Sequence, residues 1–170
     1  MSEQQNIPPL RFTEADAERA YNEWSANCGP GAIAAVAGMT LDELRPHLGD
    51  FEKKGYTNPK LMFEILRRLE MRVTVLKPPD WPTFGLVRVQ WEGPWMNPGV
   101  PMMARYRHTH WVAGARRNGS IGVFDINCMN SCGWVPLDDW SAIIAPYLIK
   151  HHAKNGSGGW HLTHAIEVKI

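Results

Sequence analysis

Residues 27–38 read NCGPGAIAAVAG, and the interpretation of the fold starts from this stretch. Residues 31–37 are small and apolar on every side, which predicts a short helix buried in the core rather than an amphipathic surface helix. Pro30 suits the first turn of such a helix, and Gly38 suits its end. Cys28 therefore lies where a buried helix begins.

This position gives Cys28 two possible roles. Unpaired backbone N–H groups and the positive end of the helix dipole stabilise a thiolate at a helix start, and the thiolate is the nucleophilic form of cysteine. The flanking Gly29 and Gly31 permit the close approach of a substrate backbone. The same cysteine also fits a buried residue that packs as a small apolar side chain. The segment alone leaves both interpretations open.

The composition describes one globular domain. The chain has 170 residues, of which 44% are apolar, and a net charge of +1. At this length a core can be buried without disulfide or metal staples. Residues 1–9 are polar and end in Pro8-Pro9, so we expect a flexible arm there and a single domain over residues 10–170. The near-neutral charge argues against nucleic acid as a partner.

The sequence also bears on the compartment. No apolar run approaches the roughly 20 residues that cross a bilayer, and residues 1–12 lack a basic segment followed by an apolar one. The three cysteines form an odd set, which favours reduced thiols. We therefore expect a cytoplasmic protein without a membrane partner. The oligomeric state does not follow from these observations.

Hydrophobic periodicity predicts helices in the first half of the chain and sheet in the second. A capping box formed by Thr40 and Glu43 opens the second helix, and Asn118-Gly119 is a strong hairpin signal. The middle of the chain is rich in proline and tryptophan and is expected to be mostly loop. The expected helices cover residues 31–37, 41–48, 59–69 and 137–150, and the expected strands cover 71–75, 86–90, 101–106, 110–116, 121–125 and 160–170. The strands around the hairpin form an antiparallel meander.

The hairpin supplies a base for the thiol. His110 begins the strand that pairs, across the turn at residues 118–119, with the strand ending at Asp125. His110 therefore comes within hydrogen-bond reach of Asp125 or Asn127, and this third group fixes the tautomer of the imidazole. His108 lies on the same face of its strand as His110 and is an alternative base, as Asn127 is an alternative to Asp125.

Three segments resemble the papain-like cysteine peptidase superfamily, and most closely its compact bacterial double-glycine leader peptidases. They are Cys28-Gly29, Thr109-His110-Trp111-Val112 and Val123-Phe124-Asp125, within a resemblance that covers residues 12–127. The order Cys, His, Asp is that of the superfamily. The resemblance implies an α+β papain-like fold, in which N-terminal helices carrying the cysteine pack on an antiparallel sheet carrying the histidine and the aspartate.

The resemblance also assigns site residues. It implies Cys28 as nucleophile, His110 as general base and then acid, and Asp125 as the group that orients His110. Superfamily members place an amide side chain, usually Gln, six residues before the cysteine, and Asn22 stands there as a donor to the oxyanion together with the Cys28 N–H. Two departures are that Asn22 is one methylene shorter than Gln and that Ile126 follows the aspartate, where the leader peptidases usually have proline.

The expected activity is acyl transfer through a thioester, most simply a peptidase or amidase acting on a peptide or protein substrate without a cofactor. One alternative is a papain-like fold kept as a catalytically silent binding or assembly module. Another is a small zinc-stabilised domain, because His108, His110, Cys128 and Cys132 are ligand types that zinc accepts. The spacing of the two cysteines fits zinc, whereas two histidines alternating on a strand are not diagnostic, so no metal is assigned.

Overall fold

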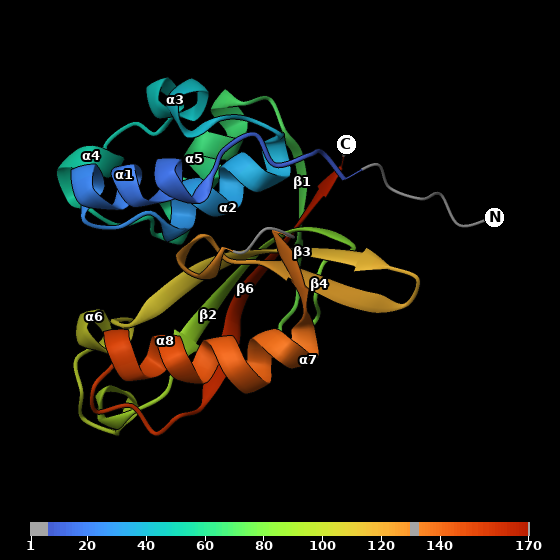
Figure 1. The fold of residues 1–170 in the computed structure, drawn as a ribbon. Helices are drawn as coiled ribbons and strands as arrows, with labels where there is room; N and C mark the ends of the chain where they lie inside the picture. Colours follow the sequence, from blue (N-terminus) through green and yellow to red (C-terminus); the bar gives the residue numbers. More distant parts are fainter. Residues whose placement is uncertain (1–6, 130–132, 170) are drawn as a thin grey trace.

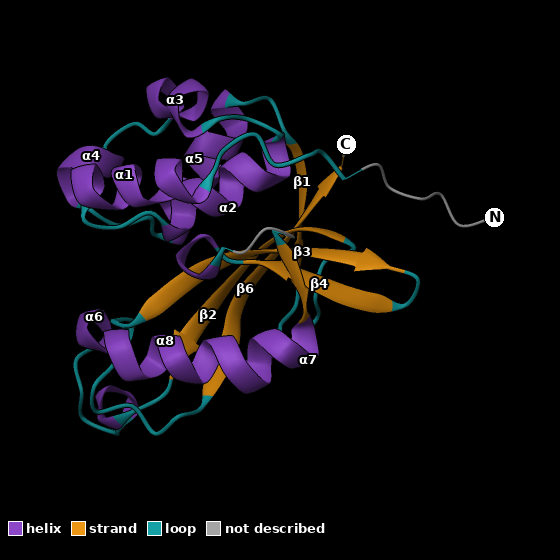
Figure 2. Cartoon of the chain, in the orientation of Figure 1, coloured by secondary structure: helices purple, strands orange, loops and turns teal. Residues whose placement is uncertain are grey.

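The computed structural model describes residues 7–129 and 133–169. Within these residues the chain forms an α+β arrangement, as expected, in which a six-stranded antiparallel sheet lies between two helical layers. The helices of the N-terminal half cover one face of the sheet, and a single long helical segment covers the other (Figures 1 and 2). No helix in the described part of the chain is both long and apolar enough to span a membrane.

The N-terminal layer consists of short helices with defined starts. The side chains of Thr13 and Thr40 form capping boxes, and that of Asn58 accepts a hydrogen bond from the Leu61 N–H. The helices are α1 (Glu14–Trp24), α2 (Cys28–Ala37), α3 (Leu41–Leu44), α4 (Phe51–Lys54) and α5 (Pro59–Arg68). Helix α2 is buried along almost its whole length, which agrees with its apolar sequence.

The sheet has the strand order β1-β6-β2-β3-β4-β5. The strands are β1 (Arg72–Leu76), β2 (Phe84–Trp91), β3 (Thr109–Arg117), β4 (Ser120–Phe124), β5 (Trp134–Pro136) and β6 (Trp160–Lys169). Of the expected meander, the hairpin of β3 and β4 is present, and the strand that continues it is β5, which was not predicted, rather than residues 101–106. The last strand, β6, instead inserts between β1 and β2.

Both faces of the sheet are buried, and they contribute to two separate cores. On the face that carries α2, Leu86 and Trp111 pack with the N-terminal helices. On the opposite face, Val87 and Val112 pack with Trp140 and with the helical segment that runs through α7 (Leu137–Asp139), a π-helical turn (Trp140–Ile144) and α8 (Ala145–His152). This segment agrees with the helix expected over residues 137–150.

Three expectations about elements were wrong or incomplete. Residues 101–106, expected as a strand, contain the short helix α6 (Met102–Arg105), because Met102 and Met103 stay exposed and no neighbouring strand pairs with them among the described residues. Strand β2 is longer than expected and lies inside the sheet. Helices α1 and α4 and strand β5 were not predicted.

The ends of the chain are described only in part. Of the arm expected over residues 1–9, residues 1–6 lie outside the description, and Ile7 packs against the core on the α2 face. The last expected strand is described as far as Lys169.

Candidate active site

Helix α2 positions Cys28 at its first residue, in close contact with two neighbouring segments. A Cβ added to Gly29 would lie 2.6 Å from Thr57 Cβ, and one added to Gly31 would lie 2.6 Å from Ile126 Cβ, so neither position has room for a side chain. The two glycines therefore let the first turn of α2 lie directly against the segments before α5 and after β4. This contact brings Cys28 to the strand ends that carry the other candidate residues.

His110 and Asp125 form a buried pair beside Cys28. His110 Nε2 lies 2.8 Å from Asp125 Oδ2, and both residues are at least 95% buried. Asp125 Oδ2 also accepts a hydrogen bond from Trp140 Nε1 at 3.0 Å, and Oδ1 accepts one from the backbone N–H of Asn127 at 3.0 Å. Burial alone would raise the pKa of Asp125, but the charge of His110 and these hydrogen bonds lower it. Asp125 is thus held as a carboxylate.

The Cys28 thiol lies close enough to the His110 ring and to the Trp111 backbone N–H for both groups to act on its pKa. Burial opposes charge on Cys28, yet His110 and Trp111 together lower its pKa. Burial likewise opposes charge on His110, but Asp125 and Cys28 raise its pKa to about 10. The two shifts favour a thiolate paired with an imidazolium. Because Nε2 faces Asp125, Nδ1 is the ring nitrogen left for Cys28.

Aromatic side chains fix the plane of the His110 ring. Trp91 stacks on the imidazole with ring centroids 5.5 Å apart and an interplanar angle of 25°. Trp140 in turn stacks on Trp91 at 6.2 Å while its indole N–H holds Asp125. Rotation of His110 away from Cys28 would disturb this stack, so the ring is oriented by packing as well as by hydrogen bonds.

His108, the alternative base, and Asn127, the alternative to Asp125, have other positions. His108 Nδ1 lies 3.1 Å from the His152 carbonyl oxygen, and its ring lies 4.1 Å from the centroid of Trp95. Asn127 supports Asp125 through its backbone N–H and lines the cavity beside Cys28. The series of interacting groups therefore runs Cys28, His110, Asp125, and neither the His108 ring nor the Asn127 side chain belongs to it.

The structure does not bring Asn22 to this series of groups. Asn22 is exposed on α1 and does not line the cavity around Cys28. The α1 residue that lines this cavity is the preceding one, Tyr21. Asn27 also lines the cavity, but its side-chain Nδ2 donates to the Ala17 carbonyl at 3.0 Å.

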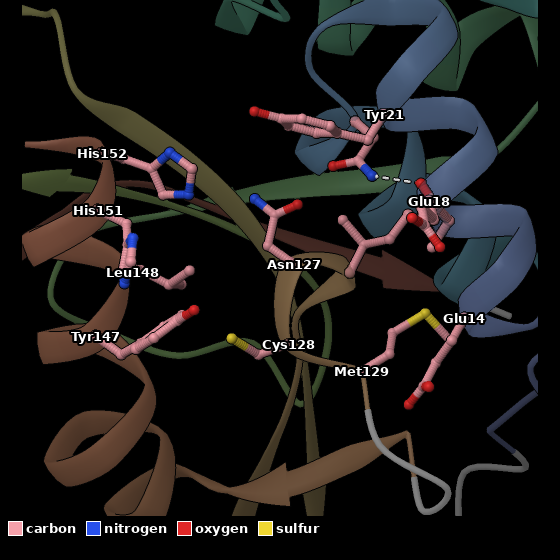
Figure 3. Close-up of a pocket in the computed structure, with 13 residues that line it drawn as sticks. Glu14, Glu18, Tyr21, Asn127, Cys128, Met129, Tyr147, Leu148, His151 and His152 are labelled. Atoms are coloured by element: carbon pink, nitrogen blue, oxygen red, sulfur yellow. Dashed lines mark hydrogen bonds between the residues drawn. The ribbon is translucent and has the colours of Figure 1, made fainter.

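Cys28 opens into a cleft formed by two adjoining cavities. A cavity of about 160 Å³ surrounds Cys28, and a larger one of about 430 Å³ adjoins it. The two cavities share the residues Tyr21, Asn27, Asn127 and His152. In the larger cavity, Tyr21 from α1 lies opposite the residues that α8 contributes, with Asn127 between them (Figure 3). The cleft therefore lies between the N-terminal helices and α8, next to the strand ends of the sheet.

The four ligand types considered for zinc do not meet in the described residues. No group of three or more His, Cys, Asp or Glu side chains is arranged there to hold a metal ion, and Cys132 lies outside the description. Cys128 is a free thiol whose pKa is raised to about 11 by burial and by the charge of Asp125. His110 is already engaged by Asp125.

Sequence reasoning missed the residues that support the site from a distance. Trp140 holds Asp125, and Tyr21 and His152 line the cleft, but these come from helices that reach the site only through tertiary packing. No local motif distinguishes them from ordinary helix residues. Trp91, from the tryptophan-rich middle of the chain, packs directly on His110.

Comparison with known proteins assigns no relative: no protein-family model matches the chain, and no curated protein matches its sequence.

Proposed function

We propose that this protein is a cysteine-nucleophile acyl-transfer enzyme of papain-like architecture, most simply a peptidase or amidase that acts on a peptide or protein. The observation that carries the proposal is the chain from Cys28 through His110 to the buried carboxylate of Asp125. A thiolate paired with an oriented imidazolium is the arrangement that nucleophilic catalysis by cysteine needs. Its placement on a helix start and two strand ends supports the papain-like assignment.

The geometry supports a two-step reaction. The Cys28 thiolate attacks the carbonyl carbon, and the His110 imidazolium gives its proton to the leaving nitrogen as the C–N bond breaks, which leaves a thioester on Cys28. His110, now neutral, then takes a proton from water, and the resulting hydroxide displaces the thiolate from the acyl group. Asp125 keeps the ring in the orientation that both proton transfers require.

The negative charge that develops on the carbonyl oxygen needs hydrogen-bond donors. The backbone N–H groups of Cys28 and Gly29, the first two residues of α2, have no intrahelical acceptor, and the positive end of the helix dipole lies beside them. The Cys28 N–H is the donor nearest to the reacting sulfur, because it belongs to the same residue. We assign the oxyanion site to this helix start rather than to the side chain of Asn22.

The proposed chemistry requires a reducing compartment. Cys28 and Cys128 are both free thiols, and a low-pKa thiolate is readily oxidised. A cytoplasmic location, in which thiols stay reduced, fits the proposal.

The pH dependence of alkylation tests the proposal without knowledge of the substrate. We expect iodoacetamide to label Cys28 rapidly at pH 6 and to label Cys128 only at high pH, because the pKa of one thiol is lowered and that of the other raised. Mass spectrometry of the digested protein separates the two sites. His110→Ala should shift Cys28 labelling to higher pH.

A second readout follows the thioester itself. The native protein treated with p-nitrophenyl acetate should carry an acetyl group on Cys28 that is released slowly by water, and Cys28→Ala should carry none. A Cys28 that labels only above pH 8 and forms no acyl-enzyme would instead identify the protein as a papain-like binding module.

A further inference from the structure

Arg88 is a buried cation without a carboxylate partner. It lies in β2 and is only 6% exposed. Its Nη2 donates to Thr109 Oγ1 at 3.2 Å, while its Nε has no hydrogen-bond partner. No carboxylate of the described residues forms an ion pair with it. A guanidinium stays charged under all ordinary conditions, so leaving it buried and unpaired costs free energy that folding alone does not recover.

The Arg88 side chain lines a cavity of about 490 Å³ that is separate from the cleft described above. The wall on one side is the start of α5, at Asn58 and Pro59, and the wall on the other side is β6. Helix α5 has ten residues, so the positive end of its dipole faces the same cavity as the guanidinium. We call this cavity the Arg88 pocket; its lining residues are Asn58, Pro59, Arg88, Tyr106, His161, Leu162, Thr163 and His164.

The residues that line the Arg88 pocket carry a net charge of about +1, which comes from Arg88. His161 Nδ1 lies 3.0 Å from Glu92 Oε1, so its charge, when it is protonated, is offset by a carboxylate. Burial lowers the pKa of His164, and the charge of Arg88 lowers it further, which keeps that ring neutral at neutral pH. A guanidinium matches a carboxylate better than any other common singly charged group, because its N–H groups form a planar fork.

The Arg88 pocket is linked to Cys28 through one strand pairing, although the two cavities share no lining residue. Arg88 pairs directly with Trp111 across the β2–β3 ladder, and the Trp111 backbone N–H is close enough to Cys28 to lower the pKa of its thiol. Burial lowers the pKa of Arg88, and the charge of the Cys28 thiolate opposes this shift, so the two groups interact electrostatically. Thr57, which touches Gly29, immediately precedes the pocket residue Asn58. Paired strand residues are about 5 Å apart, so the pocket lies on the order of two peptide residues from Cys28.

We infer that the Arg88 pocket is a specificity subsite that binds a carboxylate of the substrate close to the bond that Cys28 attacks. The inference rests on the proposed function and adds the class of substrate: a peptide with an acidic side chain or a free C-terminal carboxylate near the scissile bond. Both sources offer the same group to Arg88.

Two alkylating reagents of the same size test, on the native protein, whether the charge of Arg88 acts on a carboxylate bound next to Cys28. Iodoacetate carries a carboxylate and iodoacetamide does not, and both displace iodide as a C–S bond forms at Cys28. We expect Arg88→Gln to lower the rate with iodoacetate relative to the rate with iodoacetamide by about three- to tenfold. Arg116→Gln removes an exposed arginine from β3 and should leave the ratio unchanged.

A second pair of variants covers the case in which Arg88→Gln does not fold. Tyr106 lines the pocket and is 50% exposed, so it tolerates replacement. The carboxylate introduced by Tyr106→Glu should pair with Arg88 inside the pocket and reduce the preference of Cys28 for iodoacetate over iodoacetamide. The neutral side chain introduced by Tyr106→Gln should leave this preference unchanged. An unchanged ratio in Arg88→Gln, or equal ratios in the two Tyr106 variants, would overturn the subsite. A wild-type Cys28 that resists iodoacetamide at pH 6 would instead overturn the proposed function.

Peptide pools distinguish the two sources of the carboxylate. Random pentapeptides with a fixed central Glu and an amidated C-terminus, the same pools with Gln, and Gln pools with a free C-terminus are tested for protection of Cys28 against iodoacetamide. Stronger protection by the Glu pool assigns the pocket to an acidic side chain, and stronger protection by the free-acid pool assigns it to a C-terminus. Equal protection by all three pools would overturn the carboxylate assignment.

Discussion

The Asp125 carboxylate is held from three directions, and each contact comes from a different part of the chain. The His110 ring and the Trp140 indole meet at Oδ2, and the Asn127 N–H meets Oδ1. Since a carboxylate held by several donors keeps its charge and position, Asp125 can both stabilise the imidazolium of His110 and fix its ring. The protonation of the Cys28 thiol therefore depends on Asp125, which acts on it through His110.

Replacing Asp125 with asparagine should lower the fraction of Cys28 that is a thiolate at pH 6. The change removes the negative charge that raises the pKa of His110, so less of the thiolate–imidazolium pair is present at pH 6. We expect Asp125→Asn to slow iodoacetamide labelling of Cys28 at pH 6 by about tenfold or more, a shift of at least one pKa unit. The measurement is the labelling rate between pH 5 and 9. Asn127→Ala keeps the backbone N–H and is the control; the opposite pattern would give the orienting role to Asn127.

Replacing Asn22 should have little effect. Its side chain is exposed on α1 and outside the Cys28 cavity, and the oxyanion donors proposed above are backbone groups of α2. Asn22→Ala should therefore change the rate of Cys28 acylation by p-nitrophenyl acetate less than twofold. Removing a true oxyanion donor typically slows such a step about a hundredfold or more. A loss of that size would restore Asn22 to the oxyanion site.

Among the individual site residues, the sequence predicts those that stand in a recognisable local pattern. Cys28 stands at a recognisable helix start, and the Asn118-Gly119 hairpin sets His110 and Asp125 side by side. Arg88 and Trp140 carry no such pattern. Their roles arise from partners far along the chain, at Thr109 and Asp125, and a single sequence does not reveal those pairings.

Among the elements, α2 depends most on its glycines. A Cβ at Gly31 would lie within 3 Å of three Ile126 side-chain atoms, and Ile126 directly follows Asp125. Gly31→Ala should therefore destabilise the fold by about 1–3 kcal/mol and displace the segment that carries Asp125. Urea unfolding measures the stability, and Cys28 labelling at pH 6 measures the effect on the site.

Gly122→Ala in β4 is the matched control for this prediction. The nearest atoms to a Cβ there lie at 3.6 Å or more, an ordinary contact distance, so we expect unchanged or slightly raised stability. Equal stability in Gly31→Ala and Gly122→Ala would show that Ile126 moves aside freely.

The elements that the sequence missed are those whose local composition conflicts with their final environment. The run around Met102 and Met103 is apolar but exposed, so its hydrophobicity suggested a strand where a helical turn exists. Strand β2, predicted only over residues 86–90, contains Arg88 and Gln90 among apolar residues and follows a run of prolines, which hid its full length and its burial. In both cases tertiary packing overrides the local signal.

For the molecule as a whole, the His110–Asp125 pair makes stability depend on pH. A Cys28→Ala variant isolates this pair from the thiolate. Because Asp125 raises the pKa of His110 above its ordinary 6.5, the stabilisation is fully present below pH 6.5 and is lost as the pH rises through the raised pKa. Because the pKa of Asp125 is lowered from 3.8, its contribution is lost only as the pH falls below that value.

Cys28→Ala should thus lose on the order of 2 kcal/mol of unfolding free energy between pH 6 and pH 9, measured by urea unfolding. The double variant Cys28→Ala with Asp125→Asn serves as the reference, because its His110 lacks the carboxylate. Parallel pH profiles for the two proteins would contradict the coupling between His110 and Asp125.

The position of β6 has a consequence for biosynthesis. Residues 160–169 fill the gap between β1 and β2, so the sheet stays divided until these residues have left the ribosome. Such long-range pairing forms slowly, since a long loop must close first. Strand β2 supports β3, and β3 carries His110. The strand that carries His110 therefore gains its full support only after residues 160–169 have been made, long after Cys28.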